Sequence, residues 1–368
     1  MAITVMKGLC VLGLVLCVVM MAWKQKQMAA TSEGKEQIAH GLKPKNFIST
    51  ALVGLIANFF DTLGIGSFAP SSSAFKFTNS VDDLLVPGTL NVGDTVPVCI
   101  EAILFFEAFN IDPLTCALMC ITATIGAFLG ASIVSKWDRT KVRWGFGIGL
   151  FVLAIIMLMR LKGWGPFSIA NTEYTADLVG TTLPNGLMIH DVNGEIAAVG
   201  LRGTRLVIAC VINFLLGAAM CLGVGLYAPC MALCVLIGLH TGMAFPIMMG
   251  SCAFLMAFGN GPKFIMEGKY DIVACWNQAI FGSIGVFLAY FIVKSMNLKT
   301  LTLLVVIVCF VTSVLYVASA YLDWVKEMSK DETTRFTAFM LMMFIAVIAL
   351  IVIAIVCALP LIIAGALF

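Results

Sequence analysis

The clearest shortage in this sequence of 368 residues is charge. Asp, Glu, Lys and Arg together make up 11% of the chain, whereas hydrophobic residues make up 61%. Soluble domains have about a quarter of their residues charged. The composition therefore excludes a soluble globular protein and indicates a chain that lies in a membrane.

The sequence also lacks the motifs of several enzyme classes. It has no P-loop, no glycine fingerprint for a nucleotide and no pattern typical of a catalytic triad. Its net charge of +2, without a basic run, does not indicate nucleic-acid binding. We therefore expect neither a primary pump nor a hydrolase, and we predict no enzyme activity and no cofactor.

Cysteine is absent from the long polar loop at 161–203, although the chain has 13 cysteines. A disulfide framework outside the membrane is therefore not expected. Two pairs, Cys116 with Cys120 and Cys230 with Cys234, have the spacing that places both thiols on one helix face. Such thiols could bind a soft metal such as Cu(I) together with methionines. In a bilayer these residues are more often apolar packing groups, and we predict no metal site.

Long apolar runs are what the sequence has in abundance. Most of them reach the about 20 residues that a helix needs to cross a bilayer. They lie at about 5–23, 47–69, 84–109, 113–135, 143–160, 204–228, 230–256, 272–293, 299–322 and 336–367. The sequence therefore predicts an all-α polytopic membrane protein. No clear cleavage site follows the first run, which favours an uncleaved anchor helix, and the lysines at 24–46 place that loop in the cytoplasm.

One eight-residue pattern occurs twice and interrupts a membrane-length apolar segment each time. Its copies, 159 positions apart, are Leu63-Gly64-Ile65-Gly66-Ser67-Phe68-Ala69-Pro70 and Leu222-Gly223-Val224-Gly225-Leu226-Tyr227-Ala228-Pro229. The same offset relates Pro87 to Pro246, Asp112 to Asp271, Cys116 to Cys275 and Ile125-Gly126 to Ile284-Gly285. Glycine and proline destabilise helices. The pattern therefore predicts broken helices at matching points of two homologous halves, as in many secondary transporters.

The repeat divides the chain into five parts. They are an N-terminal helix and loop (1–45), a first transmembrane repeat (46–160), an extracytoplasmic loop (161–203), a second repeat (204–322) and a C-terminal helix (323–368). Asn193-Gly194 between two alternating runs predicts a β-hairpin in the outer loop. Five crossings per half would invert one half relative to the other, and the charges of the loops favour inversion. If the short segments at 71–83 and 230–243 are re-entrant, the halves are instead parallel.

We expect the substrate to bind at the two breaks. A helix that begins in mid-membrane directs its free N–H groups and positive end into the protein, which suits an anion. The residues assigned to this site are Gly64, Gly66, Ser71 and Ser72 at the first break, Gly223, Gly225 and Cys230 at the second, and Thr89 and Asn91 on the helix after the first break. The alternative is that the glycines only permit close helix packing.

Ionisable residues in the apolar segments are the second group of candidates, because charge is costly in a bilayer. They are Asp61, Asp94, Glu101, Glu107, His240 and Lys263. We predict proton coupling for Asp61 and Asp94; the alternative is that both are satisfied structural groups. Glu107 is expected to reach solvent and His240 to pack. Lys263 either offsets the charge of an anion or lies at the interface.

With these breaks and this repeat, the chain resembles the TauE/SafE sulfite-exporter family of membrane permeases. The resemblance covers about 46–322. It is carried by the two Gly-rich stretches closed by proline, by Gly88-Thr89-Leu90, by Asn110-Ile111-Asp112 and, more loosely, by Gly268-Lys269-Tyr270-Asp271. The glycine runs are thinned here by Ser67-Phe68 and Leu226-Tyr227, and Asp61 stands where a small or apolar residue is expected.

The resemblance implies a transporter of sulfite, thiosulfate, sulfonates or other small organic anions in the bacterial plasma membrane. We therefore expect a secondary transporter, and the resemblance implies an exporter. Its expected partners are the anion and the lipid bilayer. A homo-oligomer is compatible with the sequence. Two alternatives stay open. Pro229-Cys230 suggests a thiol-redox relay, although the matching position holds Ser71. A passive anion channel could use the same scaffold.

Overall fold

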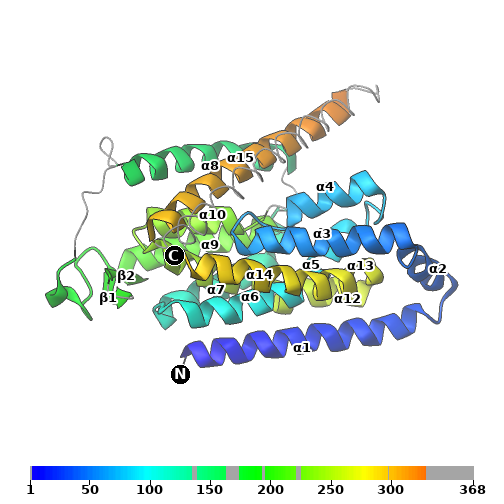
Figure 1. Ribbon diagram of the computed structural model, residues 1–368, viewed down its shortest axis with the longest axis horizontal. Coiled ribbons are helices and arrows are strands. Elements are labelled where there is room, and N and C mark those ends of the chain that lie inside the picture. Colours follow the sequence, from blue (N-terminus) through cyan, green and yellow to red (C-terminus); the bar gives the residue numbers. More distant parts are fainter. Residues whose placement is uncertain are drawn as a thin grey trace, which may run out of the picture. The chain divides into compact units, whose positions relative to one another are not determined.

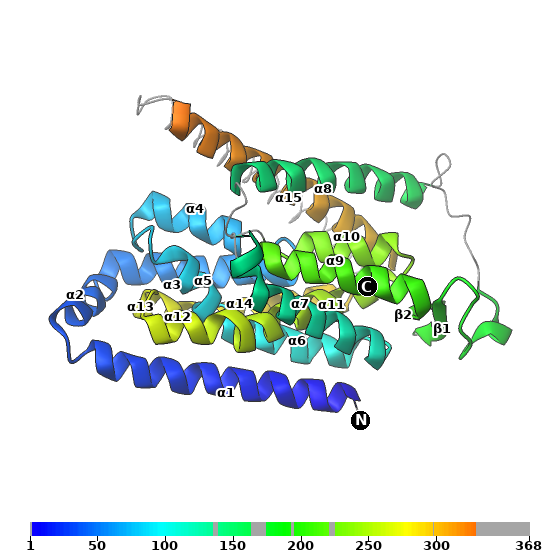
Figure 2. The same ribbon diagram turned by 180° about the vertical axis from the view of Figure 1, so that it is seen from behind.

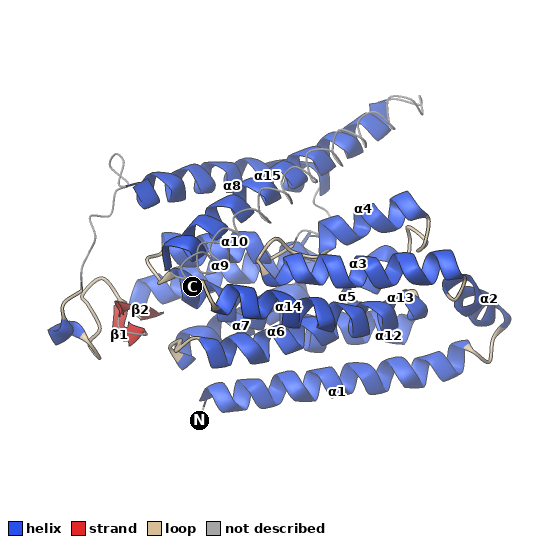
Figure 3. Cartoon of the chain, in the orientation of Figure 1, coloured by secondary structure: helices blue, strands red, loops and turns tan. Residues whose placement is uncertain are grey.

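The computed structural model describes residues 2–134, 139–162, 174–192, 195–220, 225–296 and 298–328. These residues form helices and one two-stranded antiparallel sheet (Figure 3). Gly223 of the second break and the apolar run at 336–367 lie outside the described residues.

Six helical segments within the described ranges are long and apolar enough to cross a membrane. They are Ala2–Met28, Val86–Ala108, Pro113–Gly130, Gly203–Met220, Thr241–Glu267 and Ile272–Lys294. The chain is therefore an all-α polytopic membrane protein, which confirms the fold class that the apolar runs predict.

The helices before the outer loop follow the apolar runs, with interruptions at Gly and Pro. They are α1 (Ala2–Met28), α2 (Ser32–Gly41), α3 (Pro44–Thr62), α4 (Phe68–Thr78), α5 (Val86–Gly93), α6 (Thr95–Ala108), α7 (Pro113–Val134) and α8 (Arg139–Lys162). The predicted first break is present, because α3 ends at Thr62 and α4 begins at Phe68. With 11 residues, α4 is too short to cross a bilayer.

The rest of the described chain begins with a 3₁₀ turn and the hairpin, followed by a second set of interrupted helices. Its elements are η2 (Ala176–Leu178), β1 (Leu187–Val192), β2 (Glu195–Leu201), α9 (Gly203–Met220), α10 (Tyr227–Leu236), α11 (Thr241–Phe254), η3 (Leu255–Asn260), α12 (Gly261–Glu267), α13 (Ile272–Asn277), η4 (Gln278–Gly282), α14 (Ser283–Lys294) and α15 (Leu298–Met328). Both η3 and η4 are π-helical segments, in which the backbone hydrogen-bond register shifts by one residue.

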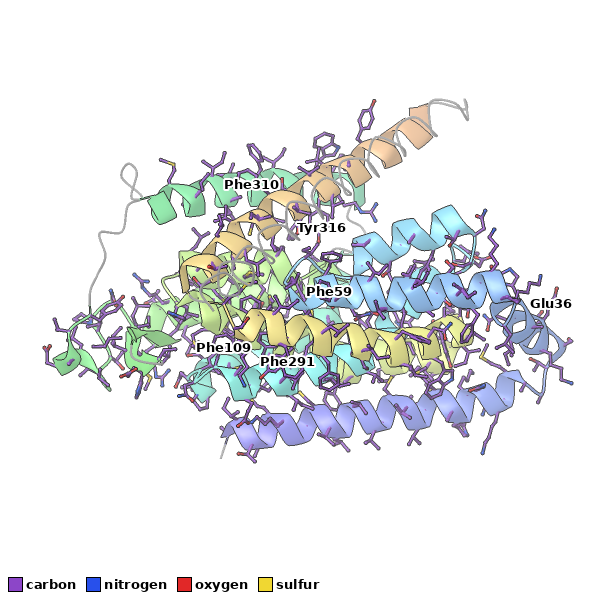
Figure 4. The ribbon with its side chains drawn as sticks, viewed as in Figure 1. Glu36, Phe59, Phe109, Phe291, Phe310 and Tyr316 are labelled. Carbon is purple, nitrogen blue, oxygen red and sulfur yellow. The ribbon has the colours of Figure 1, made fainter. Side chains whose placement is uncertain are left out.

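The chain separates into two compact units. One contains 1–135 and 174–291, and the other contains 136–173 and 292–368. In the second unit α8 packs along α15, where Phe151 meets Phe310 at 5.5 Å between ring centroids and Ser313 Oγ donates to the Gly147 carbonyl at 2.6 Å (Figures 1 and 4). The candidate site lies in the first unit.

Helix α11 forms the core of the first unit. All of its residues are buried, and it packs against α6, α7 and α10. Phe245 of α11 stacks on Phe105 of α6 at 5.3 Å and on Phe109, which is labelled in Figure 4, at 6.2 Å. A helix buried on all sides explains why α11 is apolar all round.

The hairpin is docked onto the end of the first unit where α7 and α11 begin. The backbone N–H of Asp112 donates to Val199 at 3.1 Å, and that of His240 donates to Ala198 at 2.9 Å. Arg202 also makes two hydrogen bonds to the carboxylate of Asp112, at 2.6 and 2.9 Å. Strand β2 therefore joins the starts of two helices that are far apart in sequence.

The start of α3 and the short helix α13 meet at the other end of the unit, beside α2 (Figures 1 and 2). Gln37 of α2 donates to the Tyr270 carbonyl at 3.2 Å, and Asn277 donates to the Phe47 carbonyl at 3.1 Å. The hairpin and α2 thus mark opposite ends of the helical bundle.

Two helix crossings depend on glycine. A side chain at Gly126 of α7 would overlap the Phe214 carbonyl of α9, and one at Gly285 of α14 would overlap the Leu55 carbonyl of α3. In both crossings the backbones approach so closely that only glycine fits, as is common between membrane helices.

Candidate functional site

The first break is a glycine-dependent turn between α3 and α4. Gly64 and Gly66 have φ angles of +98° and +90°, which residues with side chains rarely adopt. A side chain at Gly64 would overlap the methyl end of Met231 on α10, so the first break touches the helix that follows the second break. At Gly66 a side chain would meet no atom within 4 Å, and this glycine is partly exposed.

Three carboxylates are buried around this break. Asp61 is 2% exposed, and Asp94 and Glu101 are 0% exposed. Asp61 lies in the last turn of α3, Asp94 at the junction of α5 and α6, and Glu101 two turns further along α6. Glu101 and Asp94 are both within electrostatic range of Asp61. The fold therefore brings three acidic groups from two polypeptide segments into one region.

Ser67, at the end of the first break, joins two of these carboxylates. Its backbone N–H donates to Asp61 Oδ1 at 2.6 Å, and its hydroxyl donates to Asp94 Oδ2 at 3.0 Å. The Asp61 carboxylate thus takes the backbone donor directly before α4, where the positive end of a helix dipole stabilises negative charge.

Helix α3 supplies two further donors. Asn58 donates to Asp94 Oδ1 at 3.2 Å, and Thr62 donates to Glu101 Oε1 at 2.7 Å. Asn58, Asp61 and Thr62 share one face of the helix, because they are three and four residues apart. This face of α3 is therefore polar along its inner turns.

The second break contributes one hydroxyl. Tyr227, the first residue of α10, donates to Glu101 Oε2 at 2.7 Å and is 3% exposed. Glu101 is therefore held from α3 on one side and from α10 on the other. The hydroxyl of Tyr227 thus links the second break to the group of carboxylates.

Among the described residues, none of the three carboxylates forms an ion pair. Each is held by neutral donors from amide, hydroxyl or backbone groups. A buried carboxylate without a positive partner is costly in its ionised form, and the cost is greater in a membrane protein. The arrangement therefore favours binding of a proton or a cation at this place. Within the same residues, no group of three His, Cys, Asp or Glu side chains has the geometry of a metal site.

The other residues assigned to the site from sequence have varied surroundings. Ser71 is fully buried and its hydroxyl has no partner among the described residues, whereas Ser72 is partly exposed. The hydroxyl of Thr89 accepts from the N–H of Asp271 at 2.9 Å, so it ties α5 to the start of α13. Asn91 donates to the Pro87 carbonyl at 2.8 Å. Within the described residues, neither Thr89 nor Asn91 makes a hydrogen bond to the three carboxylates.

At the second break, Gly225 is partly exposed and Cys230 is fully buried beside Cys234. The described cysteines are free thiols. Gly223 lies outside the described residues.

The remaining ionisable candidates have different surroundings. Glu107 is 74% exposed and pairs with Lys7 of α1. The Nδ1 atom of His240 accepts from the Gly242 N–H at 3.1 Å and so caps α11. Lys263 is exposed. The exposure of Glu107 agrees with the expected contact with solvent.

Sequence reasoning missed four donors that the fold gathers here. Asn58 and Thr62 could have been found from their spacing to Asp61 on one helix face, since polar residues three and four apart line one side of a helix. Ser67 was noticed only as a substitution within the glycine run. The pairing of Tyr227 with Glu101 joins residues 126 positions apart and has no local signal.

Comparison of this chain with protein-family models, with curated proteins and with solved structures gives no significant match.

Proposed function

We propose that this protein is a secondary transporter that moves a small anion together with protons in the same direction across a membrane. The observation that carries the proposal is the group of three buried carboxylates at the first break, held by neutral donors alone among the described residues. Intramembrane carboxylates of this kind are typical of proton relays in transporters.

The direction of coupling follows from charge. Two unit charges 4 Å apart repel by about 4 kcal/mol at an effective dielectric constant of about 20. An anion therefore binds beside these carboxylates only after their charge is neutralised, so proton and anion travel as one loaded state. After the anion and the proton are released, the empty carrier returns with the carboxylates ionised.

Asp61 is our first choice for the coupled proton. Its Oδ1 atom accepts at 2.6 Å from the Ser67 N–H, which is the donor directly before α4, and an ionised carboxylate is the stronger acceptor. Protonation weakens this acceptor and frees the N–H and the positive helix end for the substrate anion. Asp61 and the anion thus compete for one donor, and a proton decides the outcome.

We also propose that the scaffold is an inverted repeat. The two glycine crossings support this. Gly126 and Phe214 form the first crossing, and their counterparts at an offset of 159 positions, Gly285 and Leu55, form the second. The directions of the helices also support an inverted repeat. Helix α3 begins at the α2 end of the bundle, whereas its counterpart α9 begins at the hairpin end (Figure 1). Helix α7 begins at the hairpin end, whereas its counterpart α13 begins at the α2 end, where Gln37 of α2 donates to the Tyr270 carbonyl. Inverted halves are common in carriers with alternating access.

The substrate class is proposed from the resemblance to TauE/SafE permeases: sulfite, thiosulfate, a sulfonate or a related organic anion, in the bacterial plasma membrane. The resemblance implies export. A symporter exports when the outward gradient of the anion exceeds the inward gradient of the proton, so the net direction depends on both.

The test is anion flux into proteoliposomes, with sulfite, thiosulfate, a sulfonate and a carboxylate in turn. We expect saturable uptake of a sulfur anion, faster when the outside is more acidic, and counterflow when the lumen holds unlabelled anion. Flux without saturation or counterflow would indicate a channel. No flux of any of the four anions by folded protein would refute the proposal.

A further inference from the structure

Glu101 makes contacts that need one more hydrogen than its partners hold. Its Oε1 atom lies 2.7 Å from the hydroxyl oxygen of Thr62, and its Oε2 atom lies 2.7 Å from the hydroxyl oxygen of Tyr227. The hydroxyl oxygen of Thr62 is also 2.9 Å from the Asn58 carbonyl oxygen. Each of these contacts between oxygens has the length of a hydrogen bond. Thr62 and Tyr227 together supply two hydrogens for the three contacts, since each hydroxyl has one.

A proton on Glu101 supplies the missing hydrogen. A carboxylic acid has one O–H group, which donates, and one carbonyl oxygen, which accepts. With the proton on Oε1, Glu101 donates to Thr62, Thr62 donates to the Asn58 carbonyl, and Oε2 accepts from Tyr227. Every contact then has its own hydrogen. With Glu101 ionised, Thr62 would have to share one hydrogen between the carboxylate and the Asn58 carbonyl.

Thr122 shows how this arrangement differs from that of an ordinary threonine in a helix. Its hydroxyl is 2.9 Å from the Leu118 carbonyl and 3.0 Å from the Met119 carbonyl. Both acceptors are backbone carbonyls of its own helix and have no hydrogen to give, so the single hydrogen of Thr122 serves both. The second acceptor of Thr62 is a carboxyl group on another helix, which can take up a proton.

The surroundings of Glu101 also favour its neutral form. Glu101 is 0% exposed and forms no ion pair among the described residues. Lys7 of α1, a helix that also packs on α6, pairs with the exposed Glu107 instead. The ionisable groups in electrostatic range of Glu101 include Asp61, Asp94, Tyr227 and Cys252, none of which becomes positive. A buried charge without a positive partner is costly, and uptake of a proton removes that cost.

We propose that Glu101 is an uncharged carboxylic acid that holds the two helix breaks together, a positioning role that rests on the proposed transporter. Thr62 is the last residue of α3, directly before the first break, and Tyr227 is the first residue of α10, after the second break. Glu101 connects them through hydrogen bonds on both of its oxygens. It keeps its proton when the empty carrier returns, so Asp61 and Asp94 are the carboxylates that are ionised at that step.

The matching positions of the repeat agree with a neutral link that is made once per chain. At an offset of 159 positions, Glu101 corresponds to Asn260, whose amide is neutral. Tyr227 corresponds to Phe68, which has no hydroxyl. The second half therefore has no counterpart of the bond between Glu101 and Tyr227.

Infrared spectroscopy of the purified full chain tests the proton. A protonated carboxyl group absorbs at a frequency separate from that of a carboxylate, and its band shifts in heavy water. At neutral pH we expect such a band in wild type that is lost in Glu101→Gln, which keeps an acceptor and a donor in the same place. The matched control is Glu107→Gln, because Glu107 is exposed and ion-paired and should contribute no such band. Identical bands in wild type and Glu101→Gln would overturn the proposal.

The frequency of the same band tests the link to the second break. Tyr227→Phe removes the donor to the carbonyl oxygen of Glu101, so the band should shift to higher frequency. The matched control is Tyr270→Phe. The Tyr270 hydroxyl is also buried but has no partner within the described residues, so its removal should leave the band in place. An unshifted band in Tyr227→Phe would overturn the link.

Transport separates the role of Glu101 from that of Asp61. Glu101→Leu removes the acceptor of the buried Tyr227 hydroxyl, and we expect anion flux to fall about tenfold or more. Glu101→Gln should restore most of this flux together with proton coupling, because it can make both hydrogen bonds. Flux without proton coupling in Glu101→Gln would show that the proton of Glu101 is transported, and would overturn the positioning role.

Flux and spectrum can fail independently. Absence of anion flux in a wild-type protein that has the Glu101 band refutes the transporter and leaves the protonated link between the breaks. Anion flux in a protein without the Glu101 band refutes the link and leaves the transporter.

Discussion

The two helix breaks share a sequence pattern but differ in chemistry. Around the first break lie Asp61, Ser67 and Asp94, all buried and joined by hydrogen bonds. At an offset of 159 positions the second half has Met220, Leu226 and Ala253 in their place. The second break adds the Tyr227 hydroxyl, which reaches across to Glu101 of the first half. The polar chemistry is therefore concentrated on one side of a repeated pattern.

This difference separates what builds the scaffold from what does the chemistry. The close helix crossings at Gly126 and Gly285 occur in both halves, because packing of the same backbone needs glycine at the same point. Carboxylates are costly in a membrane and occur only where function needs them. We therefore expect one site per chain, and variants at matched positions of the two halves should have unequal effects on transport and equal effects on packing.

The largest difference in transport between variants at matched positions is expected at Asp61. Asp61→Asn keeps an oxygen that accepts from Ser67 but removes the titratable proton. We expect gradient-driven accumulation of the anion to fall to background while exchange without a gradient continues, as measured by flux in proteoliposomes. The control is Met220→Leu at the matching position, which should transport normally. Full coupling in Asp61→Asn would remove this residue from the mechanism.

The next largest effect is expected at the glycines of the breaks. Gly66 has a φ of +90°, where a residue with a side chain costs about 1–2 kcal/mol. Replacing Gly66 and Gly225 together with Val should abolish transport without preventing membrane insertion. Gly8→Val is the control, since Gly8 lies within the α1 helix and also has no atom within 4 Å of its Cβ position. Normal flux in the double variant would exclude the breaks from the binding site.

A smaller and equal effect is expected at the two crossings. Gly126→Ala and Gly285→Ala each push a methyl group into a carbonyl oxygen, of Phe214 and Leu55 respectively. Overpacking of this kind costs about 1–3 kcal/mol. Both variants should lower the Tm by similar amounts in detergent. A lower Tm in only one of the two variants would contradict equivalent packing in the two halves.

The smallest effect, and one of opposite sign in the two halves, is expected at the matched residues Asp112 and Asp271. Burial raises the pKa of Asp112, but hydrogen bonds from Arg202 and Thr115 outweigh it, and the net pKa lies below the usual value. Burial is the larger influence on Asp271, whose pKa is raised despite backbone donors at Ala274 and Val273.

A lowered folded-state pKa gives stability that is present above the unfolded pKa of about 3.9 and is lost as the pH falls through the folded value. A raised pKa has the reverse effect, with stability lost as the pH rises through it. At pH 7 Asp112→Asn should therefore lower the free energy of unfolding by about 1–2 kcal/mol, and Asp271→Asn should maintain or raise it. Thermal unfolding from pH 7 to pH 3 measures both; equal changes in the two variants would refute this assignment.

The sequence predicted those features that depend on local pattern. Apolar run length indicated the membrane helices, and Gly64 and Gly66 marked the break that the structure has between Thr62 and Phe68. The cost of charge in a bilayer singled out Asp61, Asp94 and Glu101 before their proximity was known.

What the sequence could not show is which side chains meet. The bonds of Glu101 to Tyr227 and of Thr89 to Asp271 span 126 and 182 positions and depend on how the helices pack. Thr89 looked like part of the site because it lies near Asp94 in sequence, but it faces the start of α13. The shift that a π-helical segment introduces at Gln278 has no simple residue pattern.

The most direct test of the account is proton movement driven by the anion alone. Proteoliposomes contain a pH-sensitive dye in the lumen and have equal pH and equal sodium on both sides. They receive an inward gradient of a sulfonate, which stays ionised at the pH of the experiment. The account predicts that the lumen acidifies with wild-type protein and does not with Asp61→Asn. Sulfonate uptake without any change in the luminal pH would contradict proton coupling at the first break.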